Sequence, residues 1–459
     1  MPKITFMGAG STVFAKNVLG DCMLRDSLCR SEIALYDIDA TRLAESKQML
    51  DNLNASINQN RAKITGYLGV ENRREALRSA DFVVNAIQVG GYEPSTVIDF
   101  EIPKKYGLRQ TIADTLGIGG IFRALRTIPV MLDFAADMEQ VCPQAWFLNY
   151  TNPMAILTGA MLRGTSIKTV GLCHSVQVVV ESLLETLDPD NAHGLYDKSQ
   201  KPEEQGYRSL VAGINHMAWL LKLTRNGKDV YPELKKLALD FVRTQRAMPA
   251  DDEKKSGNIV RIDMMNRWGY YVTESSEHNA EYAAHWIKSK YPQLIDEYKI
   301  PLDEYPRRCI KQIEEWKKRS EEICNDKQLT HTLSREYGSR IMDAVVTNAP
   351  CQIGGNILNS GLITNLPANA VVEVPCLVDS NGVQGTFVGA LPPQCAAMNM
   401  TNINVQLLTV EAALTRRKEH IYHAAMLDPH TAAELSIDDI VAMCDELIAA
   451  HGNMLPAYN

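Results

Sequence analysis

Short apolar runs alternate with longer amphipathic stretches at the start of the chain. Residues 3–7 form a short run that is followed by an apolar-periodic stretch over 13–24, and the pattern repeats with residues 33–36 and 41–53. Short runs of aliphatic, aromatic and β-branched residues are typical of strands, whereas a period of about 3.6 residues is typical of helices. The order strand, helix, strand, helix predicts a parallel sheet, because parallel strands need long crossover connections.

The same alternation continues as far as residue 194. Further strands are predicted around residues 62–67, 81–86, 146–149 and 169–172, with helices over 122–141 and 153–162. Strands that are joined by crossover helices form a doubly wound sheet. We therefore predict an α/β fold in which residues 1–194 form a Rossmann-like, doubly wound parallel sheet.

Beyond Gly194 the alternation is lost. Residues 211–223 and 371–377 are predicted strands, residues 306–324 and 402–425 are predicted long helices, and the polar stretch 243–257 is expected to be exposed or mobile. Strands and helices without regular alternation are typical of an α+β arrangement. We predict a second, α+β domain over residues 195–459 that supplies substrate-binding and catalytic side chains.

Composition and charge narrow the class of protein. The 459 residues are 45% hydrophobic and 22% charged, as in a globular chain long enough for two domains. The 47 Lys and Arg against 55 Asp and Glu give a net charge of −8 without a basic face, so nucleic acid is not an expected partner. No apolar run reaches a bilayer span and the N-terminus lacks a signal-peptide layout, so no membrane partner is expected. Ten cysteines without close pairing suit a reducing compartment, and we expect a cytoplasmic protein.

A glycine turn follows the first predicted strand. Gly8-Ala9-Gly10-Ser11 can bring backbone N–H groups at a helix N-terminus close to a pyrophosphate, although Val13 stands where the usual fingerprint has its third glycine. Asp37 ends the second predicted strand, where a carboxylate accepts the ribose hydroxyls of a dinucleotide. Gly8, Gly10, Ser11 and Asp37 are therefore predicted to bind a nucleotide. A carboxylate would repel a 2′-phosphate, which favours NAD over NADP.

Polar residues follow the later strands of the predicted sheet, at the edge where ligands of such sheets bind. Asn152 precedes Pro153 and suits the N-cap of the next helix. Cys173 follows another strand, where a helix N-terminus can stabilise a thiolate, although most buried cysteines only pack. His216 is expected within an apolar strand, in which a histidine is more often a core residue than a ligand.

Taken alone, these residues predict an NAD domain with a candidate soft-ligand metal site. On that basis the chain would be an oxidoreductase of the lactate or malate dehydrogenase type. An NAD-responsive regulatory module is a weaker alternative, because no DNA-binding helix pair or partner-binding tail is evident.

The motifs in their order resemble glycoside hydrolase family 4 over essentially the whole chain. They are Gly8-Ala9-Gly10-Ser11, Gly90-Gly91, Gly119-Gly120, Arg126-Thr127-Ile128-Pro129, Asn152-Pro153, residues 171–175 (GLCHS), residues 213–216 (GINH) and Asn365-Leu366-Pro367. Residues 88–94, 272–278 and 424–430 resemble the bacterial α-galactosidase branch of that family. The resemblance implies a small-molecule α-galactoside such as melibiose as the substrate, with α-glucoside and α-galacturonide specificities as alternatives.

The resemblance also implies a hydrolase that uses NAD⁺ without consuming it. A hydride leaves C3 of the sugar, a base removes the acidified C2 proton, the glycosidic oxygen is eliminated, water adds and the hydride returns. A divalent metal, Mn²⁺ in the family, would polarise the C2 and C3 oxygens. By resemblance Cys173 and His216 are the metal ligands and Asn152 binds the sugar. The family also implies a homodimer or homotetramer.

Two departures from the family pattern leave the acid and the base open. Phosphosugar-cleaving relatives have an Asp after the metal cysteine, whereas this chain has His174, which could act as an imidazolium acid. Those relatives also use a tyrosine base, and no single residue of this chain aligns with it. The candidates are Tyr271, Glu274, Glu277 and His278. Ser95 replaces a positively charged anchor of the phosphosugar enzymes, which favours an unphosphorylated glycoside.

Overall fold

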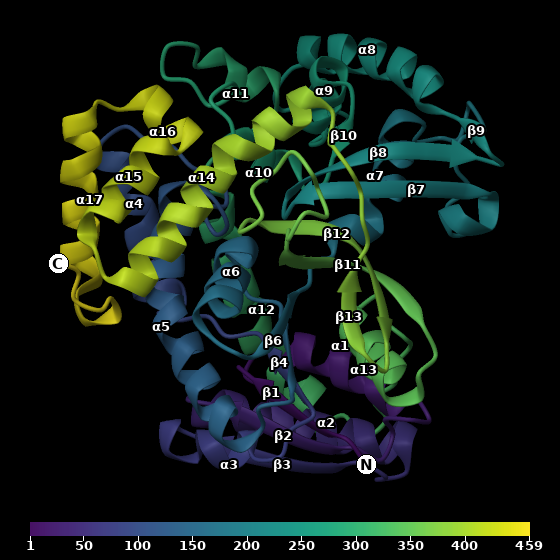
Figure 1. Ribbon diagram of the computed structural model, residues 1–459. Helices are drawn as coiled ribbons and strands as arrows, with labels where there is room; N and C mark the ends of the chain where they lie inside the picture. The colour runs from purple at the N-terminus through teal and green to yellow at the C-terminus, as the bar shows by residue number, and fades with distance from the viewer.

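One sheet of thirteen strands runs through the computed structural model, which describes residues 1–459 (Figure 1). Half of this sheet is parallel, in the order β6 (Lys168–Gly171), β5 (Trp146–Asn149), β4 (Phe82–Asn85), β1 (Lys3–Met7), β2 (Glu32–Asp37) and β3 (Lys63–Leu68). This strand order confirms the predicted Rossmann-like, doubly wound sheet.

The other half of the sheet is antiparallel and comes from the second part of the chain. Its order is β10 (Tyr271–Val272), β8 (Met217–Arg225), β7 (Tyr207–Ile214), β12 (Val371–Asp379) and β11 (Cys351–Leu358), with β13 (Gly382–Gly385) beside β12 and β9 (Lys228–Asp229) beside β8. Strand β11 joins the halves, because Asn356 pairs with Gly171 of β6. The second part therefore has the predicted α+β character.

Helices cover both faces of the parallel half. Helices α1 (Thr12–Met23) and α2 (Ala40–Asn58) pack on one face, and α3 (Arg73–Leu77) and α5 (Gly117–Val141) pack on the other. Successive side chains of a strand point to opposite faces. In β2, accordingly, Ile33 and Leu35 join the core cluster of α1 and α2, whereas Ala34 and Tyr36 join that of α5. Strands covered on both faces are apolar throughout, which is why the sequence pattern revealed them.

Segments of the second half return to cover the first half. Helix α12 (Glu304–Asn325) lies along α2, where the Trp316 indole donates to Glu45 at 3.0 Å. Helix α13 (Tyr337–Thr347) packs on α1, and α14 (Pro393–Thr415) packs on α5 and α6 (Met154–Gly164). The division at residues 194 and 195 stays a prediction, since these contacts and the shared sheet link the two parts.

Two segments differ from the predicted elements. The predicted strand 211–223 is a hairpin of β7 and β8, so His216 lies in its turn with φ of 64° and not inside a strand. The predicted helix 402–425 is divided into α14 and α15 (Lys418–Leu427), with Arg416 between them at φ of 62°. The β7–β8 turn lies in a buried, largely apolar stretch, whereas the break between α14 and α15 lies at charged residues 416–418. Apolar residues resume on both sides of each break, so the hydrophobic pattern continues across them.

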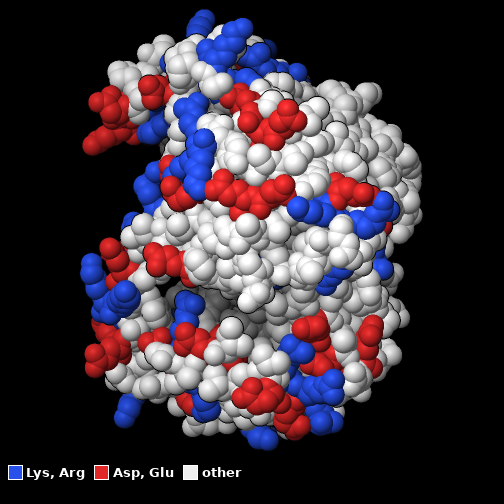
Figure 2. All heavy atoms as spheres, turned by 90° about the vertical axis from the view of Figure 1, so that its left-hand side faces the viewer, with Lys and Arg blue, Asp and Glu red and all other residues white.

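The remaining α-helices pack around this framework. They are α4 (Val97–Lys105), α7 (Ser175–Leu187), α8 (Tyr231–Ala247), α9 (Ile259–Trp268), α10 (Ser276–Glu281), α11 (Gln293–Glu297), α16 (Pro429–Glu434) and α17 (Ile437–His451). Among them, α9 and α10 are largely buried. Helices α15, α16 and α17 gather beside α4 at the left of Figure 1. Figure 2 shows that side of the molecule, where acidic and basic side chains are interspersed around a hollow. None of the helices has both the length and the apolar run that a bilayer crossing requires.

Candidate active site

A cavity of about 500 Å³ lies where the parallel half of the sheet meets the β7–β8 hairpin. Ser11, Asn152 and Cys173 reach it from loops that follow β1, β5 and β6. His216 and Glu274 reach it from the hairpin and from the segment after β10. Ligands of parallel sheets bind at the carboxyl ends of the strands, so the cavity stands where the fold predicts a site.

The predicted nucleotide residues lie together at the end of β1. Gly8 has φ of +83°, and a Cβ there would lie 2.8 Å from the carbonyl oxygen of Ala86. The Gly10 N–H donates to Asp37 Oδ2 at 2.6 Å, and Ser11 lines the cavity. Side-chain-free residues beside a strand-end carboxylate can approach a dinucleotide closely, so this geometry suits NAD.

Cys173, His216 and Glu274 form a cluster whose possible ligand atoms all lie within 4.8 Å of one another. His216 Nε2 is 3.4 Å from Glu274 Oε2, while His216 Nδ1 is 3.0 Å from the Tyr282 hydroxyl. Tyr282 therefore orients the ring and leaves Nε2 facing the cluster. Two of the three were predicted as metal ligands, whereas Glu274 was predicted only as a base.

The electrostatics of this cluster suit a cation. Burial raises the pKa of the Cys173 thiol, and the carboxylates of Glu373 and Glu274 raise it further. Burial alone would raise the pKa of Glu274, but His216, His278 and Arg261 outweigh it and hold that pKa below its ordinary value. A thiol, an imidazole and a carboxylate are donors that a divalent transition metal accepts. The residues present therefore fit the Mn²⁺ that the family resemblance implies.

A second group of polar side chains adjoins the cluster. His278 Nε2 is 3.6 Å from Asp114 Oδ1, and a hydrogen bond of 2.9 Å joins His278 Nδ1 to the Ser275 hydroxyl. The Asn152 amide donates to Asp114 Oδ2 at 3.2 Å, so Asn152 contacts a side chain and does not cap α6. Burial alone would raise the pKa of Asp114, but its interactions with His278 outweigh burial and hold the pKa well below the usual range.

The loop that carries Asp114 is held by a buried carboxylate. Glu281 of α10 accepts the backbone N–H of Thr111 at 2.7 Å and that of Ala113 at 2.8 Å. Ala113 has φ of 52°, which a non-glycine residue adopts only where its surroundings hold it. Glu281 therefore fixes the backbone directly before Asp114.

His174 lines the same cavity beside Cys173. Its Nε2 is 2.6 Å from Glu336 Oε1, and this hydrogen bond raises the pKa of His174. The His174 side chain is 53% exposed, so it is accessible from the cavity. An imidazole whose protonated form is favoured in this way can act as an acid.

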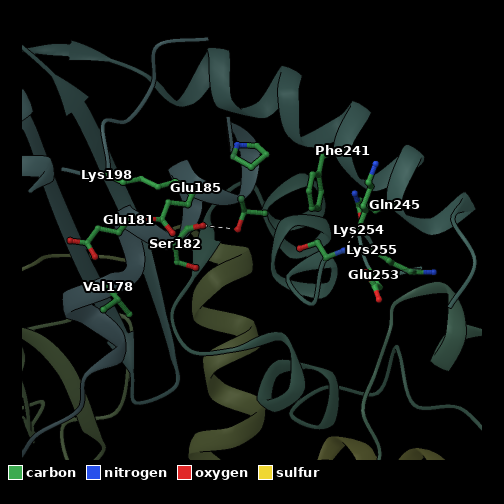
Figure 3. Close-up of a pocket in the computed structure, with 13 residues that line it drawn as sticks. Val178, Glu181, Ser182, Glu185, Lys198, Phe241, Gln245, Glu253, Lys254 and Lys255 are labelled. Carbon is green, nitrogen blue, oxygen red and sulfur yellow. Dashed lines mark hydrogen bonds between the residues drawn. The ribbon is translucent and has the colours of Figure 1, made fainter. Parts of the chain in front are cut away.

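Tyr271 and Glu277, two of the four base candidates, do not line the cavity. The Tyr271 hydroxyl is 2.7 Å from the Asn258 amide and 3.3 Å from Ser182 Oγ. Ser182 lines a different cavity of about 540 Å³ between α7, α8 and the segment before α9 (Figure 3). In that view the labelled side chains are mostly charged, and no cluster of metal-ligating groups lies among them. Glu274 and His278 are the candidates that line the cavity beside Cys173 and His216.

Ser95 gives no information on the charge of the cavity. Its side chain is fully buried and its hydroxyl contacts the sulfur of Met454 at 3.0 Å. The cations that line the cavity are instead Arg123 and Arg308.

Sequence reasoning missed Asp114, Glu336, Arg123 and Arg308. Asp114 stands five positions before Gly119 of the Gly119-Gly120 motif, so its closeness to a family motif could have marked it as a site candidate. Glu336 is 162 positions from His174 and lies outside every recognised motif, so only the fold reveals that contact.

Comparison with known proteins places the chain beside glycosidases. The model "Family 4 glycosyl hydrolase" matches residues 3–188, and the model of the C-terminal domain of that family matches residues 211–431. An α-galactosidase of Bacillus subtilis (strain 168) is 59% identical over 458 residues, with 100% of both chains covered. An α-galactosidase of Rhizobium meliloti (strain 1021) is 33% identical over 99% of this chain and 89% of its own length.

Solved structures show the same fold. A 6-phospho-α-glucosidase from gut microorganisms, solved in complex with NAD and Mn²⁺, superimposes with a TM-score of 0.77 at 20% identity. The superposition covers 100% of both chains.

Proposed function

Because the chain belongs to family 4 of the glycosyl hydrolases, as its motifs predicted, we propose that it is an α-galactosidase that requires NAD⁺ and Mn²⁺. Its substrates would be small α-galactosides such as melibiose. The observation that carries the proposal is one cavity that joins the glycine turn after β1 to the Cys173, His216 and Glu274 cluster. The 59% identity to an α-galactosidase over the full chain supports the choice of sugar.

The cofactors would be held by the residues already described. Gly8, Gly10, Ser11 and Asp37 would hold NAD⁺, and Cys173, His216 and Glu274 would hold Mn²⁺. When bound, these groups supply a hydride acceptor and a Lewis acid, respectively.

Acid and base functions can be assigned to nitrogen atoms of two histidines. His174 Nε2 is hydrogen bonded to Glu336, so His174 Nδ1 is the nitrogen that would give a proton to the leaving oxygen. His278 Nδ1 is bonded to Ser275, so Nε2 would accept the C2 proton with Asp114 stabilising the charge. We assign the base to His278 because Glu274 lies among the metal ligands. Asn152 and Asp114 would bind sugar hydroxyls.

The direct test is release of p-nitrophenol from a panel of α- and β-linked glycosides with NAD⁺, Mn²⁺ and a thiol present. We expect the α-galactoside to be cleaved fastest and no NADH to accumulate. A preference for the α-glucoside or α-galacturonide would reassign the sugar. Stoichiometric NADH without glycoside cleavage would instead support the dehydrogenase alternative. The cytoplasmic location and the homodimer or homotetramer stay predictions.

A further inference from the structure

The two cations that line the active cavity are both opposed by carboxylates. Arg123 is buried, donates to the Asn152 carbonyl and to the Tyr305 hydroxyl, and lies in the field of Asp114. An anionic sugar needs a cation whose donors are free, because charged groups bind carboxylates through paired hydrogen bonds. Arg123 is buried and its Nε and Nη1 already have partners, which leaves the more exposed Arg308 as the cation to consider.

Arg308 lies on α12 at the edge of the cavity, where two carboxylates hold it. Its Nε is 2.8 Å from Glu304 Oε1, and its Nη2 is 3.3 Å from Glu277 Oε1. Glu304 also pairs with Arg307, with Arg307 Nη2 2.9 Å from Glu304 Oε2. The positive charges of two guanidinium groups and the negative charges of two carboxylates therefore cancel at this edge of the cavity.

The ion pairs of Arg308 affect the charge at the edge of the cavity more than they affect the stability of the fold. The Arg308 side chain is 43% exposed, and ion pairs between such exposed groups contribute little to folding. Their effect on a substrate is different, because Glu304 and Glu277 take the Nε and Nη2 donors of Arg308 and oppose its charge, so that it binds a sugar carboxylate less well. Neither carboxylate lines the cavity, so both would act on an anionic sugar through Arg308 and through their negative charge beside it.

We propose that Glu277 and Glu304 restrict the cavity to uncharged sugars by occupying Arg308, so that Glu277 is a specificity-determining residue. The proposal rests on the proposed glycosidase function and deepens it. Of the two carboxylates, Glu277 is the sharper test of the proposal, because it pairs with Arg308, whereas Glu304 pairs with both Arg307 and Arg308. Removing the charge of Glu277 would leave Arg308 partly free to bind the C6 carboxylate of an α-galacturonide.

The experiment compares p-nitrophenyl α-galactoside with p-nitrophenyl α-galacturonide, which differ only in whether C6 is a hydroxymethyl or a carboxylate group. The variants are Glu277→Gln, Glu277→Gln combined with Arg308→Gln, and Glu315→Gln as a matched control. Glu315 lies on α12, as Arg308 does. It pairs with Lys311 at 3.9 Å and does not line the cavity. For each we would measure kcat/KM for both glycosides at low and high salt.

We expect Glu277→Gln to raise the galacturonide-to-galactoside ratio of kcat/KM by about tenfold, and high salt to reduce this gain. The ratio should stay at the wild-type value in Glu315→Gln and return toward it in the double variant. An unchanged ratio in Glu277→Gln, or an equal gain in the double variant, would overturn the proposal. If Glu277→Gln does not fold, Glu304→Gln tests the same proposal, because it also removes a carboxylate that pairs with Arg308. A wild-type enzyme that cleaves neither glycoside would reject the proposed function instead.

Discussion

The protonation state of the Cys173 thiol depends on what binds beside it. Burial raises the pKa of its thiol, and the nearby carboxylates of Glu373 and Glu274 oppose a thiolate further. Metals bind cysteine as the thiolate, so a cation at this position must displace a proton. Binding of a divalent cation would therefore favour the Cys173 thiolate, and Glu274 supplies a negative charge beside it.

Removing a ligand of that site should abolish turnover without preventing nucleotide binding. For Cys173→Ser and His216→Ala we expect kcat to fall on the order of a thousandfold, because Lewis-acid stabilisation contributes several kcal/mol. NAD⁺ affinity should survive, since the glycine turn follows β1 and Asp37 ends β2, away from the metal ligands. Activity assays with Mn²⁺ titration, and calorimetry with NAD⁺, provide the measurements.

Cys351→Ser is a suitable control for this prediction, because Cys351 is a half-buried thiol outside the cavity. It should retain wild-type activity. Full activity of Cys173→Ser, or of the wild type in excess EDTA, would show that Cys173 only packs.

Asp37 should contribute directly to nucleotide affinity. In Asp37→Arg the carboxylate that faces the glycine turn is replaced by a longer cation, so we expect NAD⁺ to bind about 10- to 100-fold more weakly. The matched control is Asp51→Arg, an identical charge change on α2 at a residue that pairs with Lys47. Calorimetry that gives equal affinities for the two variants would place Asp37 outside the nucleotide site.

The residues that sequence reasoning found share one property. Gly8, Gly10, Asp37 and Cys173 each stand at the end of a strand that the apolar pattern reveals or within three residues after it, so the fold and the site were predicted together. Glu336 contacts His174 only because α13 returns to pack on α1, and Arg308 reaches the cavity only because α12 lies along α2. Such long-range packing leaves no local signal in one sequence.

At the scale of elements, Asp21 of α1 anchors the segment that leads to Glu336. Its Oδ1 lies 2.7 Å from His331 Nε2 and accepts the Ser334 N–H at 2.8 Å. Its Oδ2 accepts the Ser334 hydroxyl at 2.7 Å. A carboxylate with this many partners can fix the loop before α13, and thereby the partner of His174.

Asp21→Asn should lower the melting temperature in a pH-dependent way. Burial alone would raise the pKa of Asp21, but the hydrogen bonds from His331 and Ser334 outweigh it and lower the pKa. A carboxyl with a lowered pKa in the folded state stabilises the fold fully above its unfolded pKa of about 3.9, and loses that contribution as the pH falls through the folded value. At pH 7 we expect a loss of about 1–3 kcal/mol.

Thermal melts between pH 7 and pH 3 check this prediction. The gap between wild type and Asp21→Asn should be constant near neutral pH and should close below pH of about 4. The control Asp26→Asn changes an exposed carboxyl just beyond α1 and should melt like wild type. A gap that widens in acid would contradict the assigned direction.

Elements were predicted well where strands and helices alternate, and less well where apolar stretches continue through a turn. The β7–β8 hairpin is buried on both sides of Asn215-His216, so these two polar residues are the only interruption that marks its turn. Placing His216 in a turn, not within a strand, is what exposes its ring to the cavity. The correction therefore strengthens the assignment of His216 as a ligand.

At the scale of the whole molecule, the continuous sheet brings two kinds of side chains to one cavity. The parallel half contributes the nucleotide turn and Cys173, whereas the antiparallel half and the segments after it contribute His216, Glu274 and His278. Neither half contains a complete site. Chemistry in this cavity should therefore require NAD⁺ and the metal together.

A cofactor-stripped preparation should be inactive toward α-galactosides and should recover when NAD⁺ and Mn²⁺ are both restored. No NADH should accumulate during turnover, because a hydride that returns to the sugar leaves the nucleotide unchanged. Absorbance at the NADH band, followed alongside p-nitrophenol release, measures both quantities. Full activity after complete removal of NAD⁺ would reject the redox route.

The position of His278 leads to the last prediction. Its Nε2 lies 3.6 Å from Asp114 Oδ1. This position suits a base that removes the C2 proton once C3 is oxidised, since a neighbouring ketone makes that proton acidic. Sugar product formed in heavy water should therefore carry deuterium at C2, and a substrate deuterated at C2 should react more slowly if that step limits the rate. Mass spectrometry and competitive rate measurements give the two readouts. A hydrolase that used two carboxylates would leave the C2–H bond intact, so product without deuterium together with no isotope effect would count against His278 as a C2 base. His278→Gln should lose both the exchange and the turnover. If exchange persisted in that variant, Glu274 would be the base instead.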